Sequence, residues 1–257
     1  MNPKATAMKA AQEAGDILLS NFRKNIAIRS KTTSQNLVTK VDIAAEKKIV
    51  SIIKRNFPTH SFLTEEKTTK EIESDYIWII DPIDGTNNYA HGLPHCSVSI
   101  ALYKNNQPVL GVVYDPFRNE LFFAQKNKGA FLNGKRIFVS KAKTLDKSLL
   151  VTGFYYERNQ LMTRTLGHME IFFKKNVHGI RRLGSAALDL CYVACGRFDG
   201  YWELKLSPWD FAAGALIVQE SGGRVTSSKG NSYGLNMPDI LASNNKIHDA
   251  MLTVVSK

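Results

Sequence analysis

Hydrophobic residues in the first half of the chain follow a helical period twice and a strand-like pattern afterwards. Apolar side chains recur at helical spacing over residues 4–24, which predicts an amphipathic helix. A second helix is predicted after Thr39, because Thr39-x-x-Asp42 has the form of a capping box and Pro58 follows the last apolar turn. Short apolar runs predict strands at 60–66, 76–81, 97–103, 109–114 and 120–124, with an Asn-Gly hairpin within 131–137. Because no long helix separates these strands, we expect an antiparallel sheet.

The pattern changes after the polar, basic stretch 141–147. Beyond it, strands are predicted in alternation with helices, which is typical of an α/β layout. The predicted strands cover 149–152, 177–181, 199–204, 224–226 and 240–242, and the predicted helices cover 158–173, 185–195, 208–220 and 247–255. We therefore predict an N-terminal α+β domain over residues 1–145 and a C-terminal α/β domain over residues 146–257.

The composition is that of an ordinary globular protein, since 44% of the 257 residues are hydrophobic and 22% are charged. No apolar run reaches the length of a membrane span, and the first residues lack the apolar core of a secretory signal. Cys96, Cys191 and Cys195 are odd in number and form no C-x-x-C pair, as expected of small core side chains in a reducing compartment. We expect a cytoplasmic protein without a membrane partner.

The chain is strongly basic, with 34 Lys and Arg against 23 Asp and Glu and a formal net charge of +11. Such a charge attracts phosphorylated substrates or nucleic acid through its long-range field. A solvated basic surface accounts for it equally well. No RNA-recognition aromatic motif or zinc knuckle occurs, so the sequence does not favour specific nucleic-acid readout.

The clearest chemical signal lies in residues 78–87, where an apolar strand leads into Asp81 and Asp84 and then into Gly85-Thr86. The proline after the first acid favours an extended backbone there, so both carboxylates and the Ile83 carbonyl can face a cation. Hard cations such as Mg²⁺ take oxygen ligands of this kind. The N–H groups after the glycine can hold an oxyanion if a helix begins there. This order favours phosphoryl transfer or phosphate-ester hydrolysis, with an ordinary Asp-Gly turn as the plainer alternative.

Other acids have an ordinary explanation when each is taken alone. Asp42 fits the capping box already named, and Glu65-Glu66 follows a strand as solvated acids often do. The run Ser207-Pro208-Trp209-Asp210 fits a capping box with proline at the first helical position. Glu203 lies in a predicted strand, where a carboxylate can accept hydrogen bonds from hydroxyl groups. Taken singly, these acids do not distinguish an enzyme from a plain α/β protein with capped helices.

Two longer motifs, taken together, carry a family resemblance. The first is WIIDPIDGTNNY at residues 78–89, and the second runs from WDFAAGA at 209–215 to ESGG at 220–223. Weaker matches lie at 37–42, 65–66, 184–187 and 199–203, so the likeness covers about residues 5–255. The chain resembles the inositol monophosphatase family of metal-dependent, lithium-sensitive phosphatases. The resemblance implies a layered αβαβα sandwich with the metals at the junction of its halves, and a homodimer.

The resemblance also implies a role for individual acids in binding two or three Mg²⁺ ions. Glu65, Asp81 and the carbonyl of Ile83 would hold the first ion. Asp81, Asp84 and Asp210 would hold the second, with Asp81 bridging, and Glu65 would help to bind a third, weaker ion.

The family's phosphate and substrate contacts transfer in the same way. Gly85 and Thr86 would contact phosphate through backbone N–H groups, with Lys31 near it. The Thr86 hydroxyl, paired with Asp42, would orient and deprotonate the attacking water, while Glu65 would also serve catalysis. The alcohol part of the substrate would face Gly184, Ser185, Ala186 and Glu203, and Asp84 would also bind substrate.

Two positions depart from the family pattern. Asn36 stands where many members have Asp, but that residue is not a ligand. Thr64 stands where Gly or Ser is common, which could shift the Glu65 loop and weaken the third metal site. The resemblance implies in-line attack of water on a small polyol phosphate such as inositol monophosphate, with inhibition by lithium. The alternatives are fructose-1,6-bisphosphatase, histidinol phosphatase or 3′-phosphoadenosine 5′-phosphatase activity, or an RNA- or protein-binding role on the same scaffold.

Overall fold

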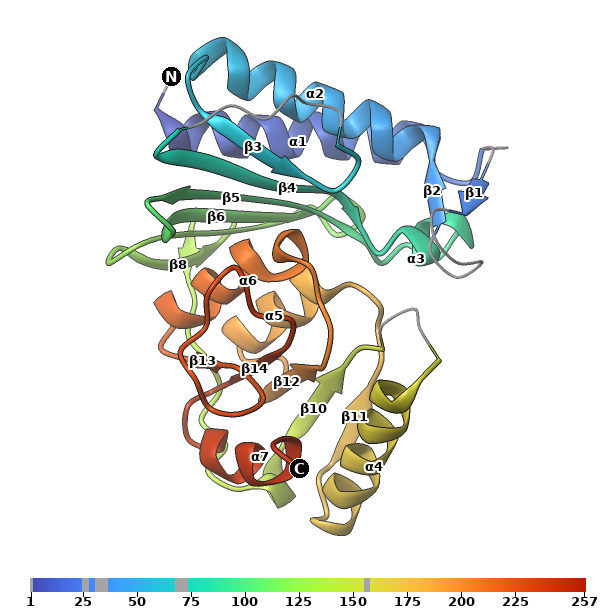
Figure 1. The fold of residues 1–257 in the computed structure, drawn as a ribbon, viewed down its shortest axis with the longest axis vertical. Helices are drawn as coiled ribbons and strands as arrows, with labels where there is room; N and C mark the ends of the chain where they lie inside the picture. The colour runs from blue at the N-terminus through green and yellow to red at the C-terminus, as the bar shows by residue number, and fades with distance from the viewer. Residues whose placement is uncertain (1, 25–27, 31–36, 68–73, 155–157) are drawn as a thin grey trace.

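The computed structural model describes residues 2–24, 28–30, 37–67, 74–154 and 158–257. Its elements stack in alternating layers of helices and sheets along the long axis (Figure 1). The bounds of the main helices are α1 (Pro3–Asn21), α2 (Lys40–Asn56), α4 (Gln160–Lys174), α5 (Ala186–Ala194), α6 (Pro208–Glu220) and α7 (His248–Val255). Helices α1 and α2 cover one sheet, α5 and α6 lie between two sheets, and α4 and α7 cover the other. The αβαβα sandwich predicted from the sequence is confirmed.

The first sheet has seven strands in the order β3-β4-β5-β6-β7-β8-β9. They are β3 (Ser61–Thr64), β4 (Tyr76–Asp84), β5 (Ser97–Lys104), β6 (Gln107–Asp115), β7 (Glu120–Gln125), β8 (Gly129–Leu132) and β9 (Lys135–Arg136). All neighbours are antiparallel except β3 and β4, so the sheet that we expected to be antiparallel is mixed at one edge. The register of β4 against β5 shifts between Asp81 and Asp84. Pro82 lies within this shift, where its missing N–H removes a ladder hydrogen bond.

The second sheet has five strands in the order β11-β10-β12-β14-β13. Their bounds are β10 (Leu149–Thr152), β11 (Gly179–Arg181), β12 (Gly200–Glu203), β13 (Arg224–Thr226) and β14 (Ile240–Ser243). Strand β10 runs parallel to β11 and β12, and the remaining pairs are antiparallel. The two sheets fall on either side of residue 145, and the division into domains of residues 1–145 and 146–257 stays a prediction.

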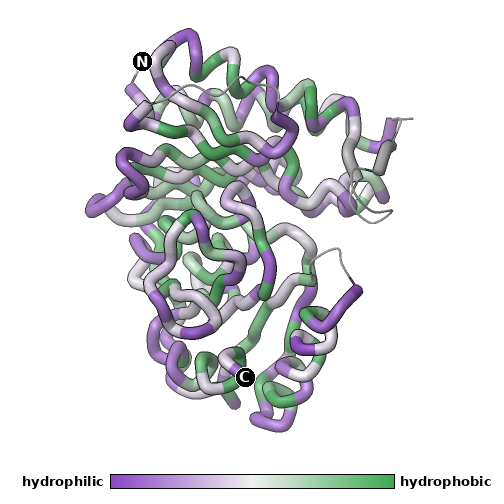
Figure 2. The backbone as a smooth tube through the Cα atoms, in the orientation of Figure 1, coloured by the Kyte–Doolittle hydropathy of each residue, from purple (hydrophilic) through white to green (hydrophobic). Residues whose placement is uncertain are grey.

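One hydrophobic cluster joins the two sheets through the central helices. It includes Ile79 of the first sheet, Phe211 of α6 and Tyr201 of the second sheet, all nearly inaccessible to solvent. Helix α6 is apolar on nearly every side, as its burial requires, and the green segments in the middle of Figure 2 follow this layer. Gly111 of β6 permits close approach, because a Cβ there would lie 2.8 Å from the Ala213 carbonyl oxygen. The central helices are therefore fixed against both sheets.

Several short elements were not predicted. A one-turn helix, α3 (Thr86–Ala90), follows β4, and β1 (Ile28–Ser30) pairs with β2 (Leu37–Thr39). A 3₁₀ turn, η1, occupies Leu145–Lys147. Within the described residues, all three cysteines are free and no helix has the length and apolarity needed to cross a membrane.

Candidate active site

A cavity of ≈ 330 Å³ lies where β4, β12 and the first turns of α5 and α6 come together. Its lining includes eight residues predicted from the sequence, namely Glu65, Asp84, Gly85, Gly184, Ser185, Ala186, Glu203 and Asp210. Segments more than a hundred residues apart in the chain therefore face one space. Lys31 and Asn36 lie outside the described residues.

The two acids of the β4 end are buried, with exposed fractions of 2% for Asp81 and 7% for Asp84. One oxygen of Asp81 accepts a hydrogen bond of 2.9 Å from the Ile83 N–H, which fixes the turn after the strand. Burial raises the pKa of Asp81 well above its usual range, and the charges of Glu65, Asp84 and Asp210 raise it further. These carboxylates are thus close enough to repel one another.

Asp84 lies against the N-terminus of α5. Its carboxylate accepts hydrogen bonds from the Ser185 hydroxyl, from the Ala187 N–H at 2.8 Å and from the Ala186 N–H at 3.2 Å. Burial raises the pKa of Asp84 to about 6, and these three donors oppose the rise. The predicted substrate-side residues Ser185 and Ala186 therefore contact the predicted metal ligand directly.

Asp210 is the third residue of α6 and belongs to the capping box that the sequence predicts. Its Oδ2 accepts a hydrogen bond of 2.7 Å from the Ser207 N–H, and Pro208 stands at the first helical position. Burial, followed by the charges of Glu65 and Asp84, raises the pKa of Asp210 well above its usual range. Asp210 can therefore cap the helix with one oxygen and still be the metal ligand that the resemblance implies.

The chemistry of these donors fits a hard divalent cation, although the ligand assignment itself stays a prediction. Among the described residues, no group of three or more His, Cys, Asp or Glu side chains is arranged to hold an ion as it stands. Asp84 and Asp210 each use a carboxylate oxygen to accept a hydrogen bond from a backbone N–H group. Nevertheless, buried carboxylates that raise one another's pKa form the electrostatic environment that a Mg²⁺ ion relieves.

Gly85 and Thr86 form the turn between β4 and α3. Gly85 has φ +100°, and a Cβ there would lie 3.1 Å from the carbonyl oxygens of Gly184 and His95, so a larger residue would be strained. The Thr86 hydroxyl lies 3.0 Å from Asp42 Oδ1 and 2.9 Å from the Ile83 carbonyl oxygen.

Asp42 contacts this turn from α2. Its other oxygen receives the N–H and hydroxyl of Thr39 at 2.8 and 2.6 Å, which completes the predicted capping box. Burial raises the pKa of Asp42. The structure therefore brings together Thr86 and Asp42, the pair that the sequence assigned to the attacking water.

Glu203 forms the opposite side of the cavity, on β12. Its Oε2 accepts a hydrogen bond of 2.7 Å from the Tyr201 hydroxyl, and burial raises the pKa of Glu203 to about 7. A Cβ on Gly153 would lie 1.8 Å from the same oxygen, so only glycine leaves room for this carboxylate.

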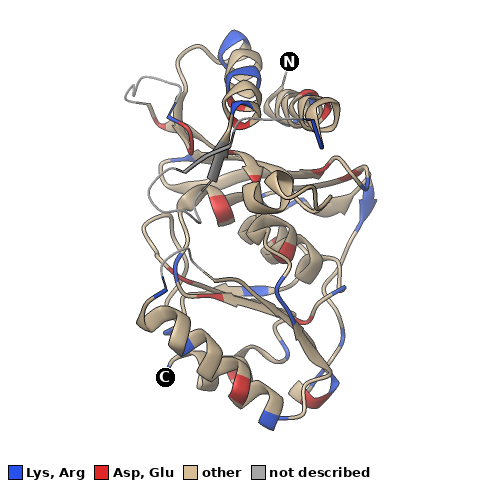
Figure 3. Cartoon of the chain, turned by 90° about the vertical axis from the view of Figure 1, so that its right-hand side faces the viewer, with Lys and Arg blue, Asp and Glu red and all other residues tan. Residues whose placement is uncertain are grey.

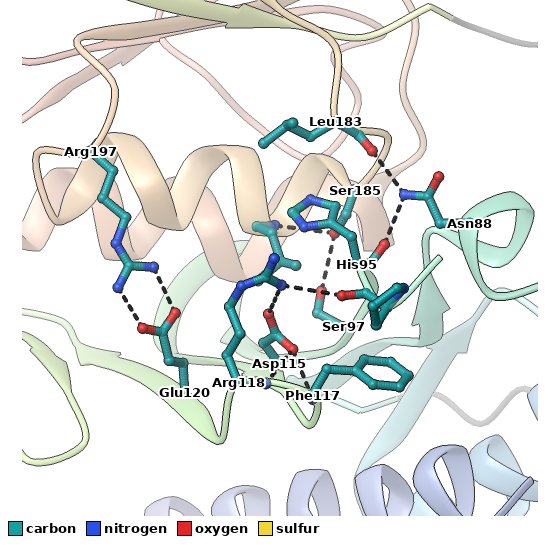
Figure 4. Close-up of polar contacts among 12 residues, drawn as sticks. Asn88, His95, Ser97, Asp115, Phe117, Arg118, Glu120, Leu183, Ser185 and Arg197 are labelled. Carbon is teal, nitrogen blue, oxygen red and sulfur yellow. Dashed lines mark hydrogen bonds and ion pairs between the residues drawn. The ribbon is translucent and has the colours of Figure 1, made fainter. Parts of the chain in front are cut away.

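Sequence reasoning missed several residues of the site. Asn88 donates from its amide nitrogen to the carbonyl oxygens of His95 and Leu183, both at 2.8 Å, and so joins the Gly85 turn to the turn before α5 (Figure 4). Its position inside the 78–89 motif is the sequence feature from which Asn88 could have been identified as a site residue. Lys67, Arg182 and Asp189 also line the cavity, and no motif pointed to them.

The structure also shows the surroundings of Thr64 and of the basic side chains; a weaker third metal site stays a prediction. The Thr64 hydroxyl is buried without a hydrogen-bond partner, so this departure from the family pattern places an unsatisfied polar atom just before Glu65. In the view of Figure 3, Lys and Arg are spread over the outer helices, sheet edges and loops instead of forming one continuous face. In this view the basic side chains of the described residues are therefore dispersed.

Comparisons with known proteins agree with this architecture. A model of the inositol monophosphatase family matches residues 3–257. The chain is 44% identical over 259 residues to Nus factor SuhB of Haemophilus influenzae, covering 99% of this chain and 96% of that protein. It is also 44% identical over 246 residues to an inositol-1-monophosphatase of Synechocystis sp., covering 95% of this chain and 85% of that protein.

Solved structures extend the similarity. An IMPase of Thermotoga maritima has a TM-score of 0.92 at 36% identity, covering 100% of this chain and 97% of that chain. An IMPase/NADP phosphatase complexed with Mg²⁺ and phosphate has a TM-score of 0.81 at 25% identity, covering 94% of this chain and 90% of that chain.

Proposed function

Because the chain belongs to the inositol monophosphatase family, we propose that it is a Mg²⁺-dependent phosphomonoesterase that hydrolyses inositol monophosphate or a similar small polyol phosphate. The observation that carries the proposal is the convergence of acids from β4, α6 and the segment after β3 beside one cavity. Their mutual repulsion has no structural use, whereas a metal-dependent phosphatase requires such a set.

The proposed metal ligands are those of the family resemblance. Glu65, Asp81 and the Ile83 carbonyl would hold one ion, and Asp81, Asp84 and Asp210 another, with Glu65 beside a third. When bound, Mg²⁺ would neutralise phosphate oxygens, acidify a water molecule and stabilise the leaving alkoxide. The relative that contains Mg²⁺ and phosphate supports this choice of metal.

The remaining chemistry belongs to side chains and amides of the chain. Thr86 would accept the proton of the attacking water as its own proton moves to Asp42, a transfer that their 3.0 Å contact permits. The N–H groups of Gly85 and Thr86 would bind phosphate oxygens, with Lys31 nearby. Glu203 would accept a hydrogen bond from a substrate hydroxyl, since the Tyr201 hydroxyl already holds the carboxylate in place.

A substrate panel tests the proposal. Phosphate release should be measured with and without Mg²⁺ on inositol 1-phosphate, fructose 1,6-bisphosphate, histidinol phosphate and 3′-phosphoadenosine 5′-phosphate. We expect Asp81→Asn to lower kcat by about three orders of magnitude or more, because the bridging charge is lost. Asp239→Asn is the matched control, because Asp239 caps Ser228 through hydrogen bonds of 2.9 and 2.7 Å and does not line the cavity. Full activity in Asp81→Asn would overturn the site assignment.

Lithium inhibition and dimerisation belong to the same proposal. Lithium should inhibit by occupying the second metal position once product has formed. Loss of inhibition in an otherwise active enzyme would indicate an altered second site. Sedimentation equilibrium would identify the expected homodimer.

A second candidate function is an RNA- or protein-binding role on the same scaffold. It is favoured by the net charge of +11 and by the name Nus factor SuhB of the Haemophilus influenzae relative. Retention of RNA at physiological ionic strength, in both the native protein and Asp81→Asn, would support it. If RNA is not retained at that ionic strength, the phosphatase remains the only proposed function.

A further inference from the structure

Asp189 is a buried acid in the cavity wall that the proposed mechanism does not use. It lies in the first turn of α5 with an exposed fraction of 1%. Its Oδ1 has no hydrogen-bond partner. A buried polar atom without a partner is costly, so native structures rarely retain one without a functional reason.

The N-terminus of α5 gives Asp189 no capping role. The N–H groups of Ala186 and Ala187 donate to Asp84, and that of Leu188 contacts the Ser185 hydroxyl at 3.4 Å. The Asp189 N–H itself donates to the Ser185 carbonyl oxygen at 2.9 Å. Because Ser185 is the N-cap residue, the helix end is complete without the Asp189 carboxylate.

The surroundings of Asp189 define what it can bind. It shares the cavity with Glu203 and Arg182. Burial, followed by the charges of Asp84 and Glu203, raises the pKa of Asp189 well above its usual range, and the Arg182 charge opposes this rise. One oxygen of Glu203 is already held by Tyr201, so the two acids offer neighbouring acceptor positions to a molecule in the cavity. Acceptors placed in this way match the hydroxyl groups of a polyol better than an apolar alcohol.

We propose that Asp189 is a specificity-determining residue that accepts a hydrogen bond from a hydroxyl of the substrate's alcohol group. Glu203 receives a second hydroxyl, so the pair selects esters of polyols that carry at least two free hydroxyls. This inference rests on the proposed phosphatase function and deepens it, because it names the free hydroxyl groups of the substrate that this part of the cavity recognises.

Asp189→Ala tests the inference in the Mg²⁺-loaded, full-length protein. For inositol 1-phosphate we expect kcat/KM to fall ~10- to 100-fold, because a substrate hydroxyl would be buried without its hydrogen-bond partner. For phenyl phosphate, whose alcohol has no free hydroxyl, the fall in kcat/KM should be at least ~10-fold smaller than for inositol 1-phosphate. Removing an unsatisfied carboxylate should leave the Tm unchanged or raise it.

Asp239→Ala is the matched control. Its carboxylate bonds to Ser228 outside the cavity, so this substitution should lower the Tm and leave the preference for inositol 1-phosphate over phenyl phosphate intact. An equal fall on both substrates for Asp189→Ala, no change on either, or a Tm loss like that of Asp239→Ala would overturn the inference.

A binding measurement separates this inference from the proposed function. Calorimetric titration with myo-inositol in the presence of Mg²⁺ and inorganic phosphate requires no turnover. If the native protein hydrolyses no ester but binds myo-inositol more tightly than Asp189→Ala, the proposed function fails and the binding role stands. If it binds no myo-inositol, the inference fails whatever the activity.

Discussion

Replacing Asn88 by Asp should loosen the connection between the two turns at the site. The Asn88 amide uses both of its hydrogens, one on the His95 carbonyl oxygen and one on the Leu183 carbonyl oxygen, each at 2.8 Å. An aspartate has nearly the same shape but no donor, so its carboxylate would face two carbonyl oxygens. The side chain is only 9% exposed, and water cannot readily replace the lost donors.

The magnitude follows from the two carbonyl groups left without partners. Each buried, unsatisfied polar group costs about 1–3 kcal/mol, so Asn88→Asp should lower the free energy of unfolding by about 2–6 kcal/mol. For a protein of this size about 2 °C of Tm corresponds to 1 kcal/mol, which gives a fall of about 4–12 °C. Activity should fall too, because Leu183 immediately precedes the turn that presents the Ser185 hydroxyl to Asp84.

Calorimetric melting and steady-state kinetics on the same samples would measure both effects. Asn133→Asp is the control, because the Asn133 amide donates to one carbonyl oxygen, that of Asn119 at 2.9 Å, from an exposed turn. Its expected cost is about 1 kcal/mol or less. Equal Tm values for the native protein and Asn88→Asp, or equal shifts in the two variants, would refute the bridging role.

Three further outcomes are expected. Gly153→Ala should lower kcat/KM for inositol 1-phosphate ~10-fold or more, because its Cβ displaces the Glu203 carboxylate; steady-state kinetics against phenyl phosphate would show whether the loss is specific. Burial lowers the pKa of His248 to about 4 from 6.5, so the unfolded chain binds the extra proton between these values. Stability should therefore be complete above about pH 6.5 and decline by up to ~1.4 kcal/mol per pH unit toward pH 4, and His248→Gln should flatten this part of the Tm–pH curve. Mg²⁺ at a hundred times its Kd should stabilise the native protein by about 2.7 kcal/mol, and chelation by EDTA should reverse this Tm shift but not affect the Tm of Asp81→Asn.

Helix α6 illustrates what the sequence could predict. Its bounds, Pro208–Glu220, agree with the predicted range because the signals are local: a serine cap, a proline at the first turn and a continuous apolar run. The capping box of α2 was predicted from similar signals. The short helix α3 was not predicted, because one turn carries no hydrophobic period and its start depends on the αL conformation of Gly85.

The remaining features depend on contacts between distant segments. Asn88 and Leu183 are 95 positions apart, and neither segment contains a sequence pattern that predicts their hydrogen bond. Asp189 was predicted only as part of a helix, because its position in the cavity wall depends on how α5 packs between the sheets. The parallel pairing of β3 with β4 was missed for a related reason: short apolar runs specify a strand but not the direction of its neighbour.

The central position of α5 and α6 has a mechanical consequence. These helices carry Asp210 and the amide donors to Asp84, and they are clamped between two sheets. Fraying of the outer helices or of surface loops would therefore leave the spacing of these acids intact. The spacing of Asp84 and Asp210 therefore depends on the packed centre of the molecule, and we expect it to persist through local opening at the surface.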